Sequence, residues 1–178
     1  MISENKAWFT QLCRIAVIRS RIYKCFYSAR ALEGKSTADI CEMIHKLHAE
    51  LQEWKHSSQF DTLFKRQGTR EEFLAGFASA ALFLMYYNSL IMVHRLPLLL
   101  NVVYQSRAES IAETDFRLLL NQSSLSAAVC VQAARDTLKL VNNLPWGDIA
   151  WIWYFSRPLP GQPQFITDYS GLYSTTSS

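Results

Sequence analysis

The stretch that decides the fold lies at residues 73–93, where the chain reads FLAGFASAALFLMYYNSLIMV and continues into His94-Arg95-Leu96-Pro97. Its 21 residues carry no formally charged side chain. A helix that is apolar on every side is typical of the centre of a bundle. Proline lacks the amide hydrogen that continues a helix, so we expect this helix to end or kink near Pro97.

Two amphipathic helices are predicted before this central helix. Residues 8–32 repeat apolar side chains in steps of three and four, with Gly34 as a stop, and Ser36 and Asp39 supply an N-cap and a first-turn carboxylate for the next helix. The two stripes favour an antiparallel hairpin. They consist of Trp8, Leu12, Ile15, Ile18, Ile22, Phe26 and Ala29 in the first helix, and of Ile40, Ile44, Leu47, Leu51 and Trp54 in the second.

The chain after the central helix is predicted to be less regular. We expect Thr69 and Glu72 to form the capping box that starts the central helix, and residues 98–120 to be broken helix with a loop. A last helix is predicted after Ser124, with an inward stripe, and residues 146–155 are expected to plug the bundle. The inward stripe would comprise Ala127, Ala128, Val131, Ala134, Leu138 and Val141. The sequence thus predicts an all-α, irregular multi-helix bundle over residues 1–156, followed by a flexible tail at 157–178.

Composition limits the possible functions without naming one. The 178 residues are 49% hydrophobic and 19% charged, which fits one globular domain, and the net charge of +3 is too small to indicate a nucleic-acid surface. The basic residues of the first helix favour a solvated helix face over a nucleic-acid patch. Four separated cysteines form no metal or disulfide pattern, and the N-terminus does not resemble a signal peptide.

The candidate chemistry is sparse. Glu42, His45 and His48 step by threes along the second helix, which resembles helical metal ligands, but surface residues beside a packed seam explain them better because a metal needs three or four convergent ligands. No nucleophile, phosphate-binding or zinc-protease motif occurs. We therefore expect no catalytic residue, no metal and no cofactor, while an enzyme without a recognisable motif stays an alternative.

A membrane protein with a single span is a second alternative. Residues 73–93 are long enough to cross a bilayer and are flanked by Arg70 and Arg95. Asn88, Ser89 and the amphipathic helices nearby favour a bundle helix instead. We expect no membrane contact.

The order of several segments resembles the fungal-specific transcription factor regulatory domain, the middle homology region of zinc-binuclear-cluster transcription factors. The resemblance rests on residues 22–28, 40–54, 84–95 and 130–135. Its main signature is an aromatic helix that ends in His94-Arg95, followed about 35 positions later by a Cys-x-x-Ala-Ala element that begins at Cys130. This chain departs from the pattern by placing Leu96 between Arg95 and Pro97, and by lacking a proline turn soon after Trp54.

The resemblance spans roughly residues 8–156 and implies a non-catalytic regulatory domain in the nucleus. It implies that this chain matches the C-terminal portion of that domain, without the DNA-binding module and so without direct nucleic-acid contact; without the resemblance, a cytoplasmic location would be expected. The motif positions are Tyr87, His94, Arg95, Pro97, Cys130 and Ala134.

Surplus apolar residues predict protein partners or self-association. Tyr86, Trp151 and Trp153 are candidates to line an apolar pocket, for which no effector is assigned, although core packing accounts for them more simply. A purely structural or non-functional product is the remaining alternative.

Overall fold

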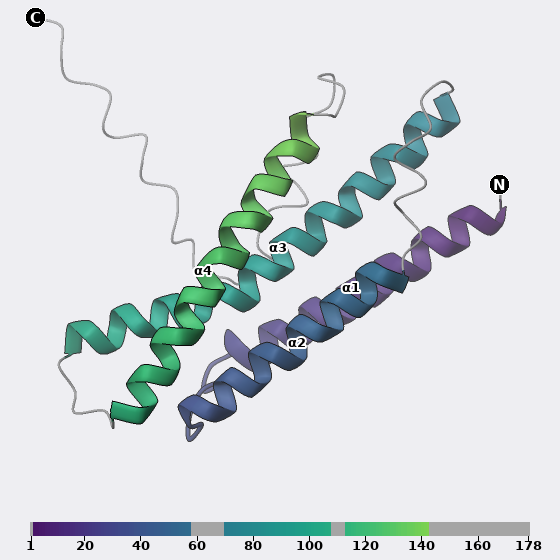
Figure 1. Cartoon of the computed structure of the whole chain (residues 1–178). Helices are drawn as coiled ribbons and strands as arrows, with labels where there is room; N and C mark the ends of the chain where they lie inside the picture. Colours follow the sequence, from purple (N-terminus) through teal and green to yellow (C-terminus); the bar gives the residue numbers. More distant parts are fainter. Residues whose placement is uncertain (1, 58–69, 108–112, 143–178) are drawn as a thin grey trace, which may run out of the picture.

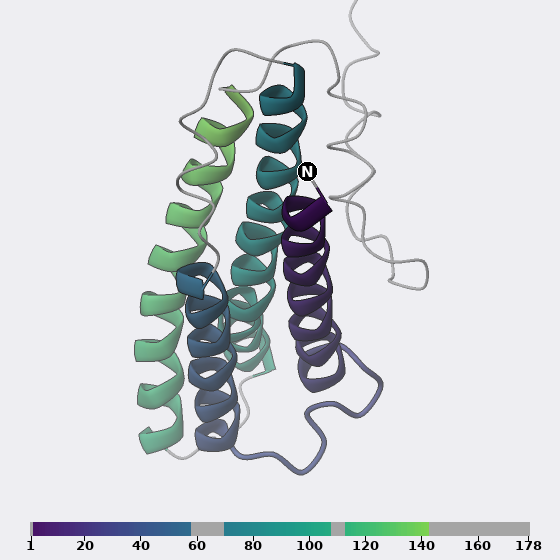
Figure 2. The ribbon, with the colours of Figure 1, turned by 90° about the vertical axis from the view of Figure 1, so that its right-hand side faces the viewer.

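The computed structural model describes residues 2–57, 70–107 and 113–142, and this part of the chain forms four α-helices (Figure 1). They are α1 (Ile2–Phe26), α2 (Thr37–Ser57), α3 (Arg70–Arg107) and α4 (Glu113–Asn142). Among the described residues there is no strand, so the all-α prediction is confirmed. Figures 1 and 2 show α1 and α2 running antiparallel beside α3, with α4 at the edge of the bundle. The plug at 146–155 and the tail at 157–178 lie outside the described residues.

The start of α2 is built by local hydrogen bonds. The backbone N–H of Ser36 donates to Asp39 Oδ2 at 2.9 Å, and the backbone N–H of Asp39 donates to Ser36 Oγ at 3.2 Å. Each side chain thereby satisfies an amide that the first helical turn leaves without a partner, which is the logic of a capping box. Ser36 is the N-cap, as predicted. The capping residue expected for α3, Thr69, lies outside the described residues.

The end of α1 differs from the sequence prediction. The helix was expected to reach residue 32, but it ends at Phe26, and residues 27–34 form turns. Arg30 has a φ of 65°, in the left-handed region, and a right-handed helix cannot pass through such a residue. Gly34, with a φ of 71°, adopts the same region without a steric penalty just before α2 begins.

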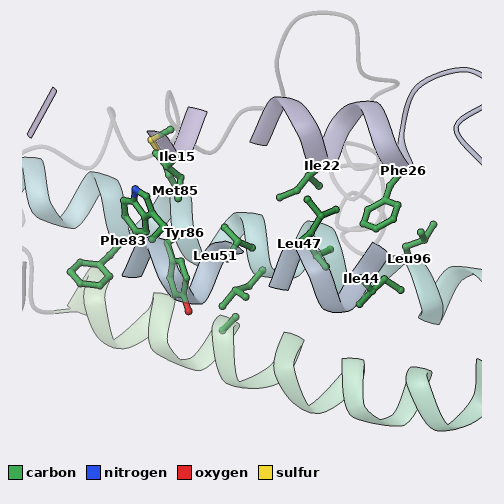
Figure 3. Packing of buried hydrophobic residues seen from close by; sticks show 14 of the residues in the cluster. Ile15, Ile22, Phe26, Ile44, Leu47, Leu51, Phe83, Met85, Tyr86 and Leu96 are labelled. Atoms are coloured by element: carbon green, nitrogen blue, oxygen red, sulfur yellow. The ribbon is translucent and has the colours of Figure 1, made fainter. Parts of the chain in front are cut away.

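The core lies where the stripes of α1 and α2 meet α3 (Figure 3). The predicted stripe of α2 is wholly buried, and in α1 Ile15, Ile22 and Phe26 are buried. Ala29, the last residue of the predicted stripe, lies in the turns after α1 and is exposed. The α3 side of this core is formed by Leu82, Phe83, Met85, Tyr86, Leu90, Val93 and Leu96. Helix α3 therefore is the central apolar helix that the sequence predicts.

Helix α3 continues through Pro97. It spans 38 residues, and Figure 1 shows its ribbon changing direction in the C-terminal part. A proline inside a helix removes one backbone hydrogen bond and bends the axis. Of the two expectations for Pro97, that the helix ends there or that it kinks there, the structure shows the kink. The prediction of broken helix with a loop at 98–120 agrees with the helical parts of this segment, because Leu98–Arg107 belongs to α3 and Glu113–Leu120 belongs to a separate helix, α4. The loop itself would fall at 108–112, outside the described residues.

Helix α4 differs most from its prediction. It begins at Glu113 rather than after Ser124, and its predicted inward stripe faces outward: Ala128, Val131, Ala134 and Leu138 are exposed. The residues that turn inward are Leu119, Gln122, Ser123, Ser126 and Ala133. Polar residues occupy the inner face because α3 presents a polar group to them, as described below.

A segment of α3, Ala78–Ser106, is long and apolar enough to cross a membrane by length and composition. Half of its most apolar window is buried by the rest of the protein. The core helix of a bundle satisfies the same criteria, and the packing on three neighbouring helices favours that interpretation.

Candidate functional site: a buried chain of hydrogen bonds around His94

The adjacent motif residues His94 and Arg95 contact different neighbours. His94 is 5% exposed and points between α2 and α4. Arg95 reaches the turn that follows α1, where it meets Tyr27. This one dipeptide on α3 therefore contacts α2, α4 and the turn that follows α1.

His94 bonds to both neighbours through its two ring nitrogens. His94 Nε2 lies 2.8 Å from His48 Nδ1 of α2, and His94 Nδ1 lies 3.0 Å from Ser126 Oγ of α4. The two imidazole rings meet edge to face, with centroids 5.0 Å apart. Since both nitrogens of His94 are engaged at good hydrogen-bond distance, the orientation of this ring is determined by its neighbours.

The hydrogen bonds extend beyond the two histidines. Gln52 Nε2 lies 3.3 Å from His48 Nε2, and Gln122 Nε2 donates to Ser126 Oγ at 3.3 Å. Gln52 also bonds the hydroxyl of Tyr86. We call the five residues Gln52, His48, His94, Ser126 and Gln122 the histidine chain.

The donors and acceptors determine the tautomers. An amide nitrogen is only a donor, so His48 Nε2 accepts from Gln52 and the proton of His48 sits on Nδ1. His48 Nδ1–H then donates to His94 Nε2, and His94 Nδ1–H donates to Ser126 Oγ. Both histidines are therefore neutral in this arrangement, and an added proton would place two donors against each other.

Burial reinforces the neutral state. Loss of water around the ring lowers the pKa of His94 from 6.5 to about 4, with smaller contributions from His48 and His45. Burial, followed by the nearby His45, also lowers the pKa of His48. At pH 7 the histidine chain is uncharged, as a buried polar network must be to avoid a large desolvation cost.

Arg95 builds a second contact, with Tyr27. Arg95 Nε donates to the Tyr27 hydroxyl at 2.7 Å, its guanidinium carbon lies 4.6 Å from the ring centroid, and the hydroxyl donates to the Met92 carbonyl at 2.5 Å. Burial raises the pKa of Tyr27, although Arg95 opposes the shift. A guanidinium both stacked on and hydrogen-bonded to a tyrosine holds the end of α1 against α3.

The other motif residues are dispersed. Tyr87 contacts Phe83 and Tyr86 within α3, with centroids 6.2 and 5.3 Å apart. Cys130 on α4 is half-buried, and burial raises the pKa of its thiol despite the opposing charge of Arg95, so the protonated, unreactive form dominates. Ala134 is exposed on α4. The motif positions thus lie on two helices, α3 and α4, and two of them, His94 and Arg95, make the contacts with neighbouring elements.

Tyr86 belongs to the core. Its side chain is 2% exposed and stacks on Trp54 at 5.9 Å, while Trp54 Nε1 donates to the Gln11 carbonyl at 3.2 Å. Burial raises the pKa of Tyr86 to about 12. The other two candidates for lining a pocket, Trp151 and Trp153, lie outside the described residues, so that pocket stays a prediction.

The three residues of α2 that resemble metal ligands, Glu42, His45 and His48, do not face the same way. Glu42 and His45 are exposed, whereas His48 turns inward to His94. Within the described residues, no group of three or more histidine, cysteine or acidic side chains could hold a metal ion. The sequence analysis missed the pairing of His48 with His94 and the roles of Gln52, Gln122 and Ser126. One signal in the sequence indicates that His48 and Gln52 lie close to the core: each directly follows a seam residue, Leu47 and Leu51 respectively.

The arrangement is suited to setting helix positions. Leaving one buried donor or acceptor without a partner costs about 1–3 kcal/mol, so rotating or sliding α4 relative to α3 carries the cost of breaking the His94–Ser126 hydrogen bond. Such a contact has two discrete states, made or broken, rather than a continuous range.

Comparison with known proteins relates the chain to fungal transcription factors. It is 33% identical over 147 residues to an ABC-transporter-regulating transcription factor of Aspergillus oryzae, and 32% identical over 147 residues to one of Aspergillus fumigatus. The alignments cover 82% of this chain and 16% of each relative, so the chain spans about a sixth of the length of these proteins. No family model and no solved structure matches. The relationship to fungal transcription factors agrees with the expectation from the motif residues.

Proposed function

We propose that this chain is a non-catalytic regulatory domain of the fungal transcription factor type, which acts in the nucleus through conformational control or through binding of a partner or ligand. The similarity to two transcription factors supports the regulatory role. The relatives are named for regulating ABC transporters, and we extend that role to this chain as part of the proposal.

The single observation that carries the proposal is the histidine chain. It joins α3 to α2 through the His94–His48 hydrogen bond and to α4 through the His94–Ser126 hydrogen bond. A partner or ligand that favours one position of α4 would shift the equilibrium between the two states by its difference in affinity for them. The regulatory output would then depend on His94, without any chemical step.

A reporter experiment tests this role. The 178-residue chain is fused to an unrelated DNA-binding module, and transcription from the cognate promoter is compared with that from the module alone. We expect the chain to change reporter output, and His94→Phe to alter that change by several-fold because it removes the hydrogen bonds to α2 and α4. His45→Phe, on the exposed side of α2, is the matched control and should behave as wild type.

Two readouts make the result decisive. Circular dichroism of both variants establishes that the helices persist, and a fluorescent fusion in a fungal cell locates the chain. Reporter output equal to that of the DNA-binding module alone would contradict a regulatory role. A difference between wild type and His94→Phe that His45→Phe reproduces would remove the histidine chain from the mechanism.

The membrane alternative has one observation in its favour, the apolar segment Ala78–Ser106. Extraction of cell membranes with alkaline carbonate separates the two possibilities. We expect the chain in the supernatant, because α3 is packed on α1, α2 and α4. Retention in the pellet would favour a membrane span.

A further inference from the structure

Exposed apolar side chains are concentrated on one part of the molecule. Among the residues whose side chains the structure describes, eight of the ten large apolar side chains that are at least 40% exposed lie on α4 or on α3 beyond Pro97, two lie on α1, and none lies on α2. Figure 2 shows α4 at the edge of the bundle with the other helices on one side of it. A concentration of exposed apolar side chains is typical of an interaction site.

On α4 three of the five exposed large apolar residues belong to one regular seam, whereas Leu118 and Leu125 lie off it. Leu120, Val131 and Leu138 are 41%, 49% and 64% exposed, and the positions between them are small. We call this set the outer seam: Leu120, Ser124, Ala127, Val131, Ala134 and Leu138. Its steps alternate four, three, four, three and four, which is the spacing of a helix that packs along another helix.

The outer seam is complementary to itself when two copies run antiparallel. Pairing Leu120 with Leu138 of a second copy aligns Ser124 with Ala134 and Ala127 with Val131, and the symmetry repeats each layer. The leucines then meet at the two ends, and the smaller side chains meet in the middle, where the helices approach most closely. No charged residue lies within the seam.

The net charges of the two ends of α4 favour the same direction. At the start of α4, Glu113, Asp115 and Arg117 sum to −1, and towards its end Arg135, Asp136 and Lys139 sum to +1. An antiparallel pair places the negative end of each copy near the positive end of the other, whereas a parallel pair would place like ends together. Charge and packing therefore agree on one orientation.

We propose that the outer seam of α4 is a homodimer interface, in which it packs antiparallel on the outer seam of a second copy of this chain. This inference deepens the proposed regulatory function by naming a partner and the surface that binds it. It places the dimer contact on the outer face of the same helix whose inner face carries Ser126 and Gln122. A shift of α4 relative to His94 would then also move the residues of the dimer interface, because both contacts lie on the same helix.

Sedimentation equilibrium of the complete chain tests the surface. Wild type should sediment as a dimer, and the double variant Val131→Glu/Leu138→Glu should dissociate with a dissociation constant raised at least about tenfold. Leu125→Glu is the matched control, because Leu125 is 63% exposed on α4 but lies off the seam. A wild-type monomer at about 100 µM would overturn the proposal, as would a seam variant that dimerises like wild type while circular dichroism shows its helices intact.

A compensation experiment tests the orientation. Leu120→Lys and Leu138→Glu should each weaken the dimer, and the double variant should regain at least about tenfold of the lost affinity, since each lysine then faces a glutamate of the other copy. In a parallel dimer lysine would face lysine, so a double variant no tighter than either single variant overturns the antiparallel pairing. Dimerisation is read as mass and regulation as reporter output, so either proposal can fail without the other.

Discussion

Helices α2 and α4 show how two similar patterns reach opposite outcomes. Both repeat apolar residues in steps of three and four. Helix α2 buries its whole stripe, including Ile44 and Leu51, against α1 and α3. Helix α4 turns most of its stripe outward and instead buries the polar Gln122, Ser123 and Ser126 together with Leu119 and Ala133. The period of a pattern determines which side chains share a face, but the neighbouring helices determine which face turns inward.

The largest expected effect contrasts a leucine from each helix. Leu51→Ala on α2 should lower the free energy of unfolding by about 2–5 kcal/mol, because the side chain is fully buried and its loss leaves a cavity. Leu125→Ala on α4 should change it by less than about 0.5 kcal/mol, because Leu125 is 63% exposed. Urea denaturation at pH 7 measures both. Equal losses would mean that α4 is covered in solution.

The next-largest effect is the pH dependence of the free energy of unfolding that arises from His94, the α3 residue that contacts the inner face of α4. The pKa of His94 is lowered to about 4 in the folded state, whereas an unfolded histidine titrates near 6.5, so the unfolded chain binds more protons between these values. The contribution of neutral His94 to the free energy of unfolding is fully present above pH 6.5 and is lost as the pH falls towards 4. We expect a loss of about 2 kcal/mol, measured by denaturant titrations across this range.

Substitution assigns that pH dependence to the histidine chain. His94→Gln removes the titrating ring and should flatten the decline between pH 6.5 and 4, whatever its stability at pH 7. His45→Gln should leave the decline almost unchanged, since His45 is exposed. If His94→Gln keeps the full slope, other groups account for the acid sensitivity.

A smaller effect compares two serines on opposite faces of α4. Ser126→Ala should cost about 1–2 kcal/mol, because it leaves His94 Nδ1–H and the Gln122 amide without their acceptor. Ser124→Ala should be nearly neutral: its exposed hydroxyl bonds only the Leu120 carbonyl of its own helix. Thermal unfolding of the pair provides the comparison, and equal melting temperatures would show that the Ser126 bond contributes nothing.

The smallest effect concerns the start of α2. Ser36→Ala removes the hydroxyl that accepts from the Asp39 amide and should cost about 1 kcal/mol. Ser36→Gly should cost only a few tenths, because glycine is tolerated as an N-cap. Melting temperatures of both variants test the capping box. A harmless Ser36→Ala would show that the first turn of α2 gains its stability from core contacts alone.

The candidate site was only partly predictable. The motif marked His94 and Arg95, and both prove to be contact residues between helices. Gln52, Gln122 and Ser126 escaped because a count of apolar residues assigns polar side chains to the outer face. Their burial depends on partners from other helices, and those partners are far away in the sequence.

By itself, the sequence determined the helical class, the apolar central helix, the N-cap of α2 and the buried stripe of α2, because each depends on local bonds or on a strong periodic pattern. Tertiary structure alone decided that α3 passes through Pro97 and that the inner face of α4 carries Gln122, Ser123 and Ser126 beside Leu119 and Ala133. The reason for the second outcome is physical: a buried imidazole needs hydrogen-bond partners, and satisfying His94 outweighed the burial of a weak apolar stripe.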